Sequence, residues 1–408
     1  MLKTEKEIAT KFGIDLELIE KKTNAQKNIR ILGNDLTFIG VREKDRTKHV
    51  HRLHPYLGKF IPQLVEVFLR KYFKKGNTIL DPFSGSGTTL VEANILGMNA
   101  IGIELSPFNV LIQKVKTKKY NIPEVEREIK DALKKLKEFS RQLTTNGQIL
   151  LFANRPIERF ETNSQYLKEW FSDRALQEIL FYRSIISEYK NQDILKIILS
   201  RSARSARLIP HYDLARPKKP IRETYWCIKH KRYCEPINEA LKFINRYSYD
   251  TIRRLKEFDK IRTSAFIEIY QGDARKIQLP ESIKIDGIFT SPPYVGVIDY
   301  HEQHRYAYEL FNFPRQDELE IGPATKGQNG NAKKEYIEGI VEVFKNVSKY
   351  LKNNALIFIV ANDKFNLYLE IGKRCGFELR DVFHRPVLMR TERDSNRYFE
   401  SIFHFVKK

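Results

Sequence analysis

The chain has 408 residues, too many for one ordinary hydrophobic core, and we expect two or three folded units. Its net charge of +21 favours a polyanionic partner, nucleic acid before a membrane surface, although a merely basic solvated surface is an alternative. Three cysteines exclude a disulfide framework, and no apolar run approaches the ~18 residues of a membrane span. We therefore predict a soluble, cytoplasmic protein without membrane partners.

Residues 1–50 are predicted to form an N-terminal helical arm. Ala9, Gly13 and Ile19 have the spacing of a helix-turn-helix, a motif that can read DNA. A plain helical hairpin that packs on the rest of the protein satisfies the same pattern, so the role of the arm stays open.

Residues 51–120 have the pattern of a parallel sheet with crossover helices. The first strand ends at Asp81, and a turn with Gly85 and Gly87 leads into a helix. A second strand ends at Glu104, and another helix follows it. This alternation of strands and helices predicts an α/β unit.

The glycine-rich turn is predicted to bind a nucleoside cofactor. A phosphate-binding P-loop needs a lysine after its glycines, and none follows Gly87. A dinucleotide-binding turn needs a third glycine, where this chain has Leu90. The acid at Asp81 suits a cofactor that carries an ammonium and a sulfonium, which is S-adenosylmethionine. Glu104 can accept hydrogen bonds from the ribose hydroxyls of that cofactor.

Residues 121–262 are predicted to be a helical, basic insertion, with helices over 124–139 and 166–189. Cys227, His230 and Cys234 lie close together, but a structural zinc site needs four ligands and only three are near in sequence. We therefore predict no metal site and a basic aromatic loop. The basic side chains expected to meet phosphates are Arg201, Arg204, Arg207, Lys218, Lys219, Lys229 and Arg232.

Sheet patterns resume in residues 263–408. Asp273 follows a strand and can accept a hydrogen bond from an adenine amino group, although Gly-Asp is also a common turn. Ser291-Pro292-Pro293-Tyr294 follows the next strand. The two prolines fix the backbone, so the serine hydroxyl and the Pro292 carbonyl can accept hydrogen bonds from an exocyclic amino group, while Tyr294 can stack on the base. The last two strands, 377–388 and 398–406, are expected to pair as an antiparallel hairpin.

Asp81-Pro82-Phe83-Ser84-Gly85-Ser86-Gly87-Thr88 with Thr290-Ser291-Pro292-Pro293-Tyr294 resembles the motif pair of amino-methylating DNA methyltransferases. Ser-Pro-Pro-Tyr is the form typical of the N4-cytosine group, whereas N6-adenine enzymes usually have Asp or Asn at its first position. The family uses S-adenosylmethionine and often belongs to restriction–modification systems. The resemblance therefore implies double-stranded DNA as the substrate and allows a cognate restriction endonuclease as a partner.

The resemblance also implies an organisation. We expect a doubly wound, Rossmann-like methyltransferase sheet with a cofactor-binding half at 51–120, a catalytic half at 263–408 and the insertion 121–262 as the target recognition domain. The expected cofactor contacts are Tyr56, Lys59, Phe60, Asp81, Phe83, Gly85, Gly87, Thr88, Glu104, Leu105 and Asp273. The expected catalytic residues are Ser291, Pro292, Pro293 and Tyr294.

The expected reaction is a direct attack of the amino nitrogen of a flipped base on the sulfonium methyl group. A C5-cytosine enzyme would need a cysteine nucleophile, usually after a proline, and none of the three cysteines follows one. Methylation of adenine N6, methylation of an RNA base, and a catalytically idle DNA-binding protein remain alternatives.

Overall fold

The computed structural model describes residues 36, 38, 41–56, 58, 60–145, 159–213, 217–387 and 398–408. Most of the predicted N-terminal arm, including the helix-turn-helix pattern, and Lys59 lie outside these residues. The described end of the arm forms a short helix, α3 (Glu43–Arg46), and a 3₁₀ turn, η1 (His49–Arg52).

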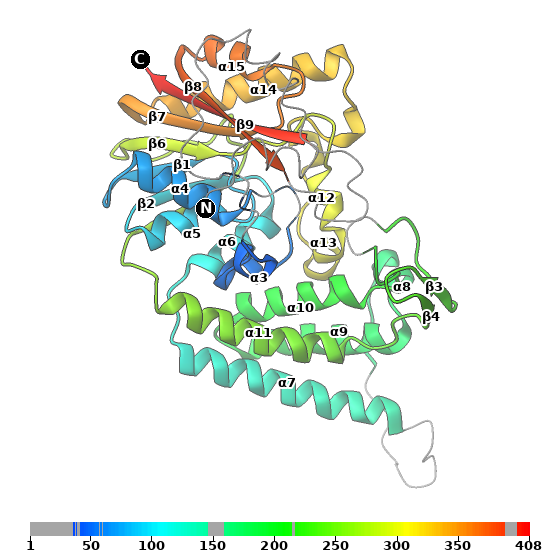
Figure 1. Ribbon diagram of the computed structural model, residues 1–408. Helices are drawn as coiled ribbons and strands as arrows, with labels where there is room; N and C mark the ends of the chain where they lie inside the picture. Colours follow the sequence, from blue (N-terminus) through cyan, green and yellow to red (C-terminus); the bar gives the residue numbers. More distant parts are fainter. Residues whose placement is uncertain are drawn as a thin grey trace, which may run out of the picture.

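A seven-stranded sheet lies at the centre of the described chain, in the order β5-β2-β1-β6-β7-β9-β8 (Figure 1). The five strands from β5 to β7 are parallel, and β9 runs antiparallel to both of its neighbours. The strands are β1 (Thr78–Asp81), β2 (Asn99–Glu104), β5 (Ile267–Gln271), β6 (Ile285–Thr290), β7 (Leu351–Ala361), β8 (Phe377–Val387) and β9 (Tyr398–Lys407). The predicted C-terminal pair is therefore present, and its last strand joins it to the sheet.

The central strands are apolar on both faces because helices cover both faces. In β1, Ile79 packs into the cluster on one face and Leu80 into the cluster on the other. Such continuous apolar strands are typical of parallel sheets buried between helix layers. The covering helices are α4 (Pro62–Tyr72) and α5 (Thr88–Ile95) on one face, and α14 (Gly330–Ser348) and α15 (Tyr368–Arg374) on the other. This is the predicted doubly wound α/β sheet.

The helices of the insertion form a layer beside the sheet (Figure 1). Their core continues into α6 (Pro107–Thr117) and α13 (Arg305–Phe311), so the insertion shares one hydrophobic cluster with the sheet domain. In this layer lie α7 (Ile122–Thr145), α8 (Gln165–Trp170), α9 (Asp173–Ile185), α10 (Gln192–Ala206) and α11 (Leu241–Asp259). Short elements are η2 (Ile186–Glu188), α12 (Tyr300–Gln303), η3 (Asp317–Leu319) and η4 (Ala324–Lys326).

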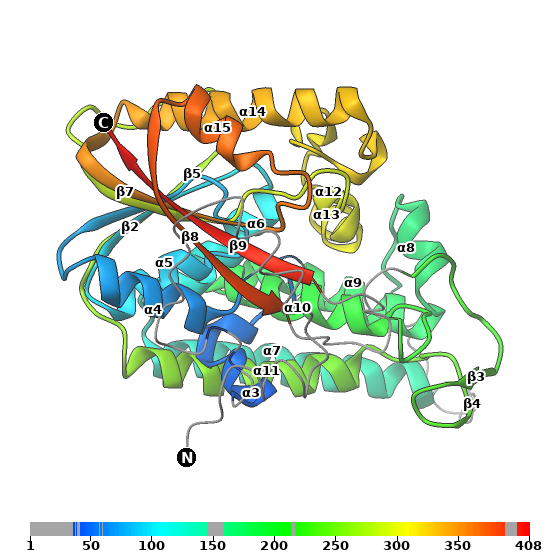
Figure 2. The same ribbon diagram turned by 45° about the horizontal axis from the view of Figure 1, so that its top comes forward.

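Two predictions for the insertion are wrong. The single helix expected over 166–189 is divided at Phe171, whose buried ring is placed by an extended backbone, and Ser172 then caps α9 by accepting a hydrogen bond from the Ala175 N–H. The insertion also contains a two-stranded antiparallel sheet, β3 (Tyr225–Cys227) and β4 (Arg232–Cys234). This hairpin stands at the periphery of the molecule in both views (Figures 1 and 2).

Within the described ranges, no helix is both long enough and apolar enough to cross a membrane.

Candidate active site

The two sequence motifs meet at the carboxyl ends of neighbouring strands. β1 and β6 pair in parallel, with Leu80 opposite Ile288. The Thr290 hydroxyl donates a hydrogen bond of 2.6 Å to the Asp81 carboxylate, and the Thr89 hydroxyl donates to the Phe289 carbonyl at 3.2 Å. The glycine-rich turn and Ser-Pro-Pro-Tyr are therefore side by side, although 209 residues separate Asp81 from Thr290.

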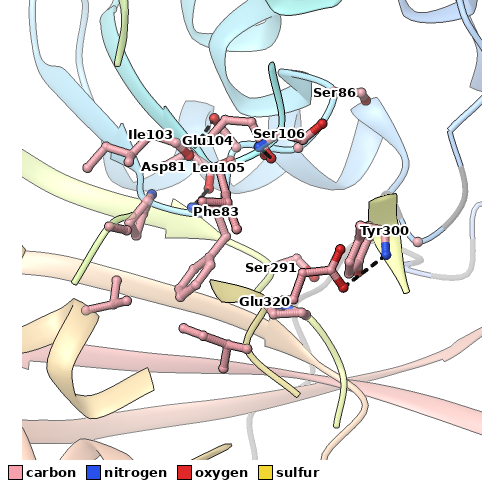
Figure 3. A pocket seen from close by; sticks show the side chains of 18 of the residues that line it. Asp81, Phe83, Ser86, Ile103, Glu104, Leu105, Ser106, Ser291, Tyr300 and Glu320 are labelled. Carbon is pink, nitrogen blue, oxygen red and sulfur yellow. Dashed lines mark hydrogen bonds between the residues drawn. The ribbon is translucent and has the colours of Figure 1, made fainter. Parts of the chain in front are cut away.

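A pocket opens at this edge of the sheet (Figure 3). Ser291 and Pro293 line it together with most of the residues predicted to contact the cofactor. The predicted cofactor residues in its wall are Tyr56, Phe60, Asp81, Phe83, Gly85, Thr88, Glu104, Leu105 and Asp273. The geometry thus brings one half of the predicted site against the other.

Gly87 shapes the turn without lining the pocket. It has a φ of 77°, which favours glycine, and its N–H donates to the Ser84 carbonyl at 2.7 Å just before α5 begins. Gly85, with a φ of 49°, gives room to Tyr56, because a Cβ there would lie 3.1 Å from the tyrosine hydroxyl oxygen.

Two buried carboxyl groups give the pocket its electrostatic character. Burial raises the pKa of Asp81 from 3.8 to about 6, against the opposing hydrogen bonds from Thr290, Thr89 and the Phe83 N–H. Burial also raises the pKa of Glu104 from 4.5 to about 7, although the Ser106 N–H donates to it at 2.8 Å and the Asn109 amide at 3.2 Å. Both groups would be stabilised as carboxylates by a cation or by further hydrogen-bond donors.

Asp273 differs from these two acids because it already has a cationic partner. Nε of Arg275 donates to both of its carboxylate oxygens, at 2.9 and 3.0 Å. Arg275 also donates to the Leu319 carbonyl at 3.1 Å, which ties it to the far wall of the pocket. The Asp273 carboxylate is therefore held in one orientation.

Unpaired hydroxyls at the start of α5 suit the carboxylate of an amino-acid cofactor. Ser86 Oγ and Thr88 Oγ1 are buried, line the pocket and have no hydrogen-bond partner among the described residues. The N–H groups of the first turn of a helix add a partial positive charge there. Buried donors without partners beside buried acids fit a ligand that has an anionic and a cationic end, as the methionine part of S-adenosylmethionine has.

Sequence reasoning missed the wall formed by the segment after Ser-Pro-Pro-Tyr. Tyr300 stacks on Tyr56, with ring centroids 6.1 Å apart. Glu320 accepts hydrogen bonds from the N–H groups of Tyr300 and His301 and also bonds the His301 ring, and all three residues line the pocket. The segment has no regular strand or helix period, so no sequence signal places these side chains.

The predicted catalytic residues divide into two groups. No donor or acceptor among the described residues bonds the Ser291 hydroxyl or the Pro292 carbonyl, which leaves both available to a ligand. The Pro293 carbonyl accepts a hydrogen bond of 2.8 Å from Tyr336, and Tyr294 bonds Glu400 at 3.2 Å. Tyr294 and Pro292 are not part of the pocket wall.

The basic residues predicted to contact phosphates differ in how exposed they are. Arg201 and Arg207 are only 7% and 5% exposed. Arg201 pairs with Asp250 at 2.8 Å, and the Arg207 guanidinium lies 5.1 Å from the centre of the Tyr306 ring. Both side chains therefore have partners inside the helical layer, and their contact with phosphates stays a prediction.

The other basic residues differ in exposure. Arg204 is half-buried, and its pKa is lowered by burial. Lys218, Lys219, Lys229 and Arg232 are exposed, and none of the four forms an ion pair within the described chain. These four are placed where a polyanion can reach them.

The cysteine–histidine cluster has a fourth member. His211 joins Cys227, His230 and Cys234, with one potential ligand atom of each residue within 4.8 Å of the others. His211 precedes Cys227 by 16 residues, beyond the usual spacing of a ligand pair, which is why sequence reasoning counted three.

Comparisons with known proteins identify relatives of this chain. A family model described as DNA methylase matches residues 3–114. The Type II methyltransferase M.MjaII of Methanocaldococcus jannaschii is 44% identical to the chain over 436 residues, which cover 90% of this chain and 82% of that protein. M.BsoBI of Geobacillus stearothermophilus is 25% identical over 72% of this chain and 58% of its own length. M.MvaI of Kocuria varians is 23% identical over 75% of this chain and 66% of its own.

Proposed function

Since the chain belongs to the Type II DNA methyltransferases, the amino-methylating N4/N6 family of restriction–modification systems, its cofactor is S-adenosylmethionine and its substrate is DNA, and we propose that it methylates the N4 amino group of cytosine in double-stranded DNA. A cognate restriction endonuclease for the same DNA site is part of this proposal.

The observation that carries the proposal is a pair of adjacent free acceptors, of which Ser291 lines the pocket and Pro292 directly follows it in the chain. The Ser291 hydroxyl and the Pro292 carbonyl have no protein partner in the described chain, and they follow directly after Thr290, which bonds Asp81 in the cofactor half. An amino group that donates one hydrogen to each acceptor would face the pocket. The amino nitrogen would then lie between these two acceptors and the methyl group of the cofactor.

Hydrogen bonding is the main catalytic contribution of the protein in this proposal. An exocyclic amino nitrogen is a poor nucleophile because its lone pair is delocalised into the ring. Two acceptors that bind its hydrogens favour a tetrahedral nitrogen with a localised lone pair. The cofactor supplies an electrophilic methyl group. The N–C bond forms as the C–S bond breaks, and the extra proton on the nitrogen leaves to solvent, so no covalent bond to the protein is needed.

We assign the orientation of the cofactor from its charged and hydrogen-bonding groups. We assign its ribose hydroxyls to Glu104, its ammonium group to the side of Asp81, and its carboxylate to the hydroxyls of Ser86 and Thr88 and the first turn of α5. Asp273, fixed by Arg275, is assigned to the adenine amino group. Each assignment joins a ligand group to a protein group of complementary charge or hydrogen-bonding capacity.

The serine supports cytosine over adenine as the target. Ser-Pro-Pro-Tyr is the form typical of the N4-cytosine group, whereas N6-adenine enzymes usually have Asp or Asn at the position of Ser291. The serine hydroxyl, like a carboxylate, can accept a hydrogen bond from the amino group, so the motif form carries the choice of base. Tyr294 is assigned to stacking on the flipped base, which requires its ring to turn toward the pocket from its bond with Glu400.

The test is the chemical identity of the product. The full chain is incubated with S-adenosylmethionine labelled in the methyl group and with duplex DNA, matched single strands or RNA, and the nucleosides are then separated and weighed. We expect N4-methylcytosine from duplex DNA. N6-methyladenine would overturn the choice of base, and label in RNA alone would overturn the choice of substrate.

A further inference from the structure

We propose that His211, Cys227, His230 and Cys234 bind one structural Zn²⁺ ion that orders the β3–β4 hairpin. The inference does not depend on which base is methylated. It rests on the donor set, on the spacing of the donors and on the exposed position of the hairpin.

The donors have the spacing of a tetrahedral zinc site. Sγ of Cys234 lies 3.5 Å from Nδ1 of His230, and Sγ of Cys227 lies 3.9 Å from Nδ1 of His211. Zn–S bonds of about 2.3 Å and Zn–N bonds of about 2.0–2.1 Å at tetrahedral angles put sulfur and nitrogen about 3.5 Å apart. Two thiolates and two neutral imidazoles are a common structural zinc set.

The strand register turns both cysteines to the same side of the hairpin. Tyr225 pairs with Cys234 and Cys227 with Arg232, so the two cysteines lie diagonally on one face. On the opposite face, Trp226 pairs with Tyr233. One face therefore gathers the sulfur atoms, and the other presents aromatic rings.

The turn and a neighbouring tyrosine bring the histidines to that face. The Cys227 carbonyl accepts hydrogen bonds from the N–H groups of His230 and Lys231, and Lys231 has a φ of 51°, which folds the chain back tightly. The Tyr225 hydroxyl bonds both the ring and the backbone N–H of His211, at 2.9 and 3.0 Å. Because Nδ1 of His211 is also the atom that lies 3.9 Å from Sγ of Cys227, a metal bound there would replace the ring's hydrogen bond with Tyr225, while the hydrogen bond from the His211 backbone N–H would still hold the residue beside the hairpin.

The hairpin has too little apolar packing to be stable by itself. It forms its own two-stranded sheet of three-residue strands, and Trp226 and Tyr233 are 52% and 70% exposed. Isolated two-stranded hairpins are marginal in water, and small elements without a core are commonly held by a metal. Yet both cysteines are buried. A zinc ion would supply the missing stabilisation at the point where the side chains converge.

A second cluster shows why the four-residue group is the better metal site. His49, His51 and Glu92 also lie together, but His51 already bonds Glu92 at 2.7 Å and Lys48 pairs with the same carboxylate at 2.9 Å. A lysine cation already occupies the position beside the carboxylate there. The hairpin cluster contains no carboxylate, and its four potential donors are two thiols and two imidazoles.

The ordered hairpin would present its charges at a fixed place. Lys229 is on the turn and Arg232 is on β4, next in sequence to Tyr233 of the exposed aromatic pair but on the opposite face of the hairpin. Cations next to exposed rings are a combination that suits nucleic acid. We therefore expect the zinc site to support DNA binding and to leave cofactor binding unaffected, since the pocket is formed by other residues.

The first measurement is metal content. The reduced full chain, purified without chelator, should contain about one zinc per chain. After removal of zinc, titration with Co²⁺ should produce the visible bands of a tetrahedral site and the charge-transfer bands of cobalt–thiolate bonds. Zinc and cobalt both far below one equivalent in folded, reduced protein would overturn the proposal.

Single substitutions identify the ligands. Cys227→Ser, His211→Ala and His230→Ala should each lose most of the metal, whereas the matched control Cys375→Ser, at a cysteine on the other side of the fold, should keep it. His230 is exposed, so its variant should fold even if the cysteine variant does not. Full metal content in His211→Ala and His230→Ala, or equal loss in the control, would contradict the assignment.

Discussion

The buried carboxyl groups of Asp81 and Glu104 make the stability of the protein depend on pH. Their pKa values in the cofactor-free protein, about 6 and about 7, lie above the usual 3.8 and 4.5. Well below pH 3.8, both groups are protonated in the folded and the unfolded chain. As pH rises, the unfolded chain releases its protons first, so the stability that these groups contribute is lost between about pH 4 and pH 7.

Cofactor binding should lower the pKa values of Asp81 and Glu104 again, because the ammonium group and the ribose hydroxyls of the cofactor stabilise the two carboxylates. We expect the affinity for S-adenosylmethionine to rise between about pH 5.5 and 7.5, and binding at pH 6.5 to release protons. Calorimetry in two buffers of different ionisation enthalpy measures the number released. Glu104→Gln should release fewer protons, and identical heats in both buffers for the unmodified protein would contradict the assignment.

Ser291 should affect the chemical step more than cofactor binding. We expect Ser291→Ala to lower kcat by about 10²-fold or more, because one of the two acceptors of the amino group is lost. The cofactor affinity should change less than about twofold. Single-turnover methyl transfer and equilibrium binding separate the two effects. Ser187→Ala, on an exposed turn, is the control, and a kcat equal to that of the control would refute the role given to Ser291.

At the scale of elements, the contact between β1 and β6 couples the two halves of the site. Thr290→Val keeps the shape of the side chain but removes the donor to Asp81. The carboxylate keeps the Phe83 N–H and Thr89 as donors but loses one buried hydrogen bond, which costs about 1–3 kcal/mol, so the melting temperature should fall and cofactor binding should weaken by about tenfold. Thr290→Ser keeps the hydroxyl and should restore both. Thermal denaturation and binding assays of the two variants test this, and equal defects in both would contradict it.

The strands could be predicted because their surroundings are uniform. Ile79 and Leu80 are both buried, so the run is apolar whichever face each residue meets, and Asp81 marks its end. The break at Phe171 could not be predicted, because a buried aromatic residue continues an apolar helical pattern equally well. The β3–β4 hairpin escaped prediction for a related reason: its rings are exposed, and no alternation of buried and exposed residues marks it.

At the scale of the whole molecule, the charge of +21 is distributed between two uses. Some basic residues hold the fold, as Arg201 does with Asp250. Others, such as Lys229 and Arg232, are exposed without an acidic partner in the described chain. The sequence gives the sum of these charges, but only the folded chain distinguishes the two uses.

Salt dependence should distinguish these uses. We expect Lys229→Ala and Arg232→Ala each to weaken DNA binding and to reduce the slope of log affinity against log salt by about 0.9. Lys349→Ala, just before β7 at the other end of the strands, should change neither the DNA affinity nor the salt slope. If the slope of log affinity against log salt is unchanged in Lys229→Ala and Arg232→Ala, the prediction that the hairpin contacts DNA is contradicted.

Arg201→Ala should instead lower thermal stability, because it leaves Asp250 with one partner fewer in a buried network.

The parts of the site that sequence could not give are those assembled across the molecule. Asp81, Glu104 and Ser291 carry signals because each follows a strand directly. Tyr300 begins the short helix α12, Glu320 follows the 3₁₀ turn η3, and His211 comes from a loop before the hairpin. Their positions depend on how distant segments pack, which no local pattern records.

The pairing of β1 with β6 also has a consequence for the order of events during synthesis. The glycine-rich turn leaves the ribosome early, while the strand that must lie beside it follows only after the entire helical insertion. Long-range pairing of this kind slows folding. A nascent chain therefore holds an incomplete active site until Thr290 meets Asp81. This delays the acquisition of activity in each new molecule until its central strands have closed.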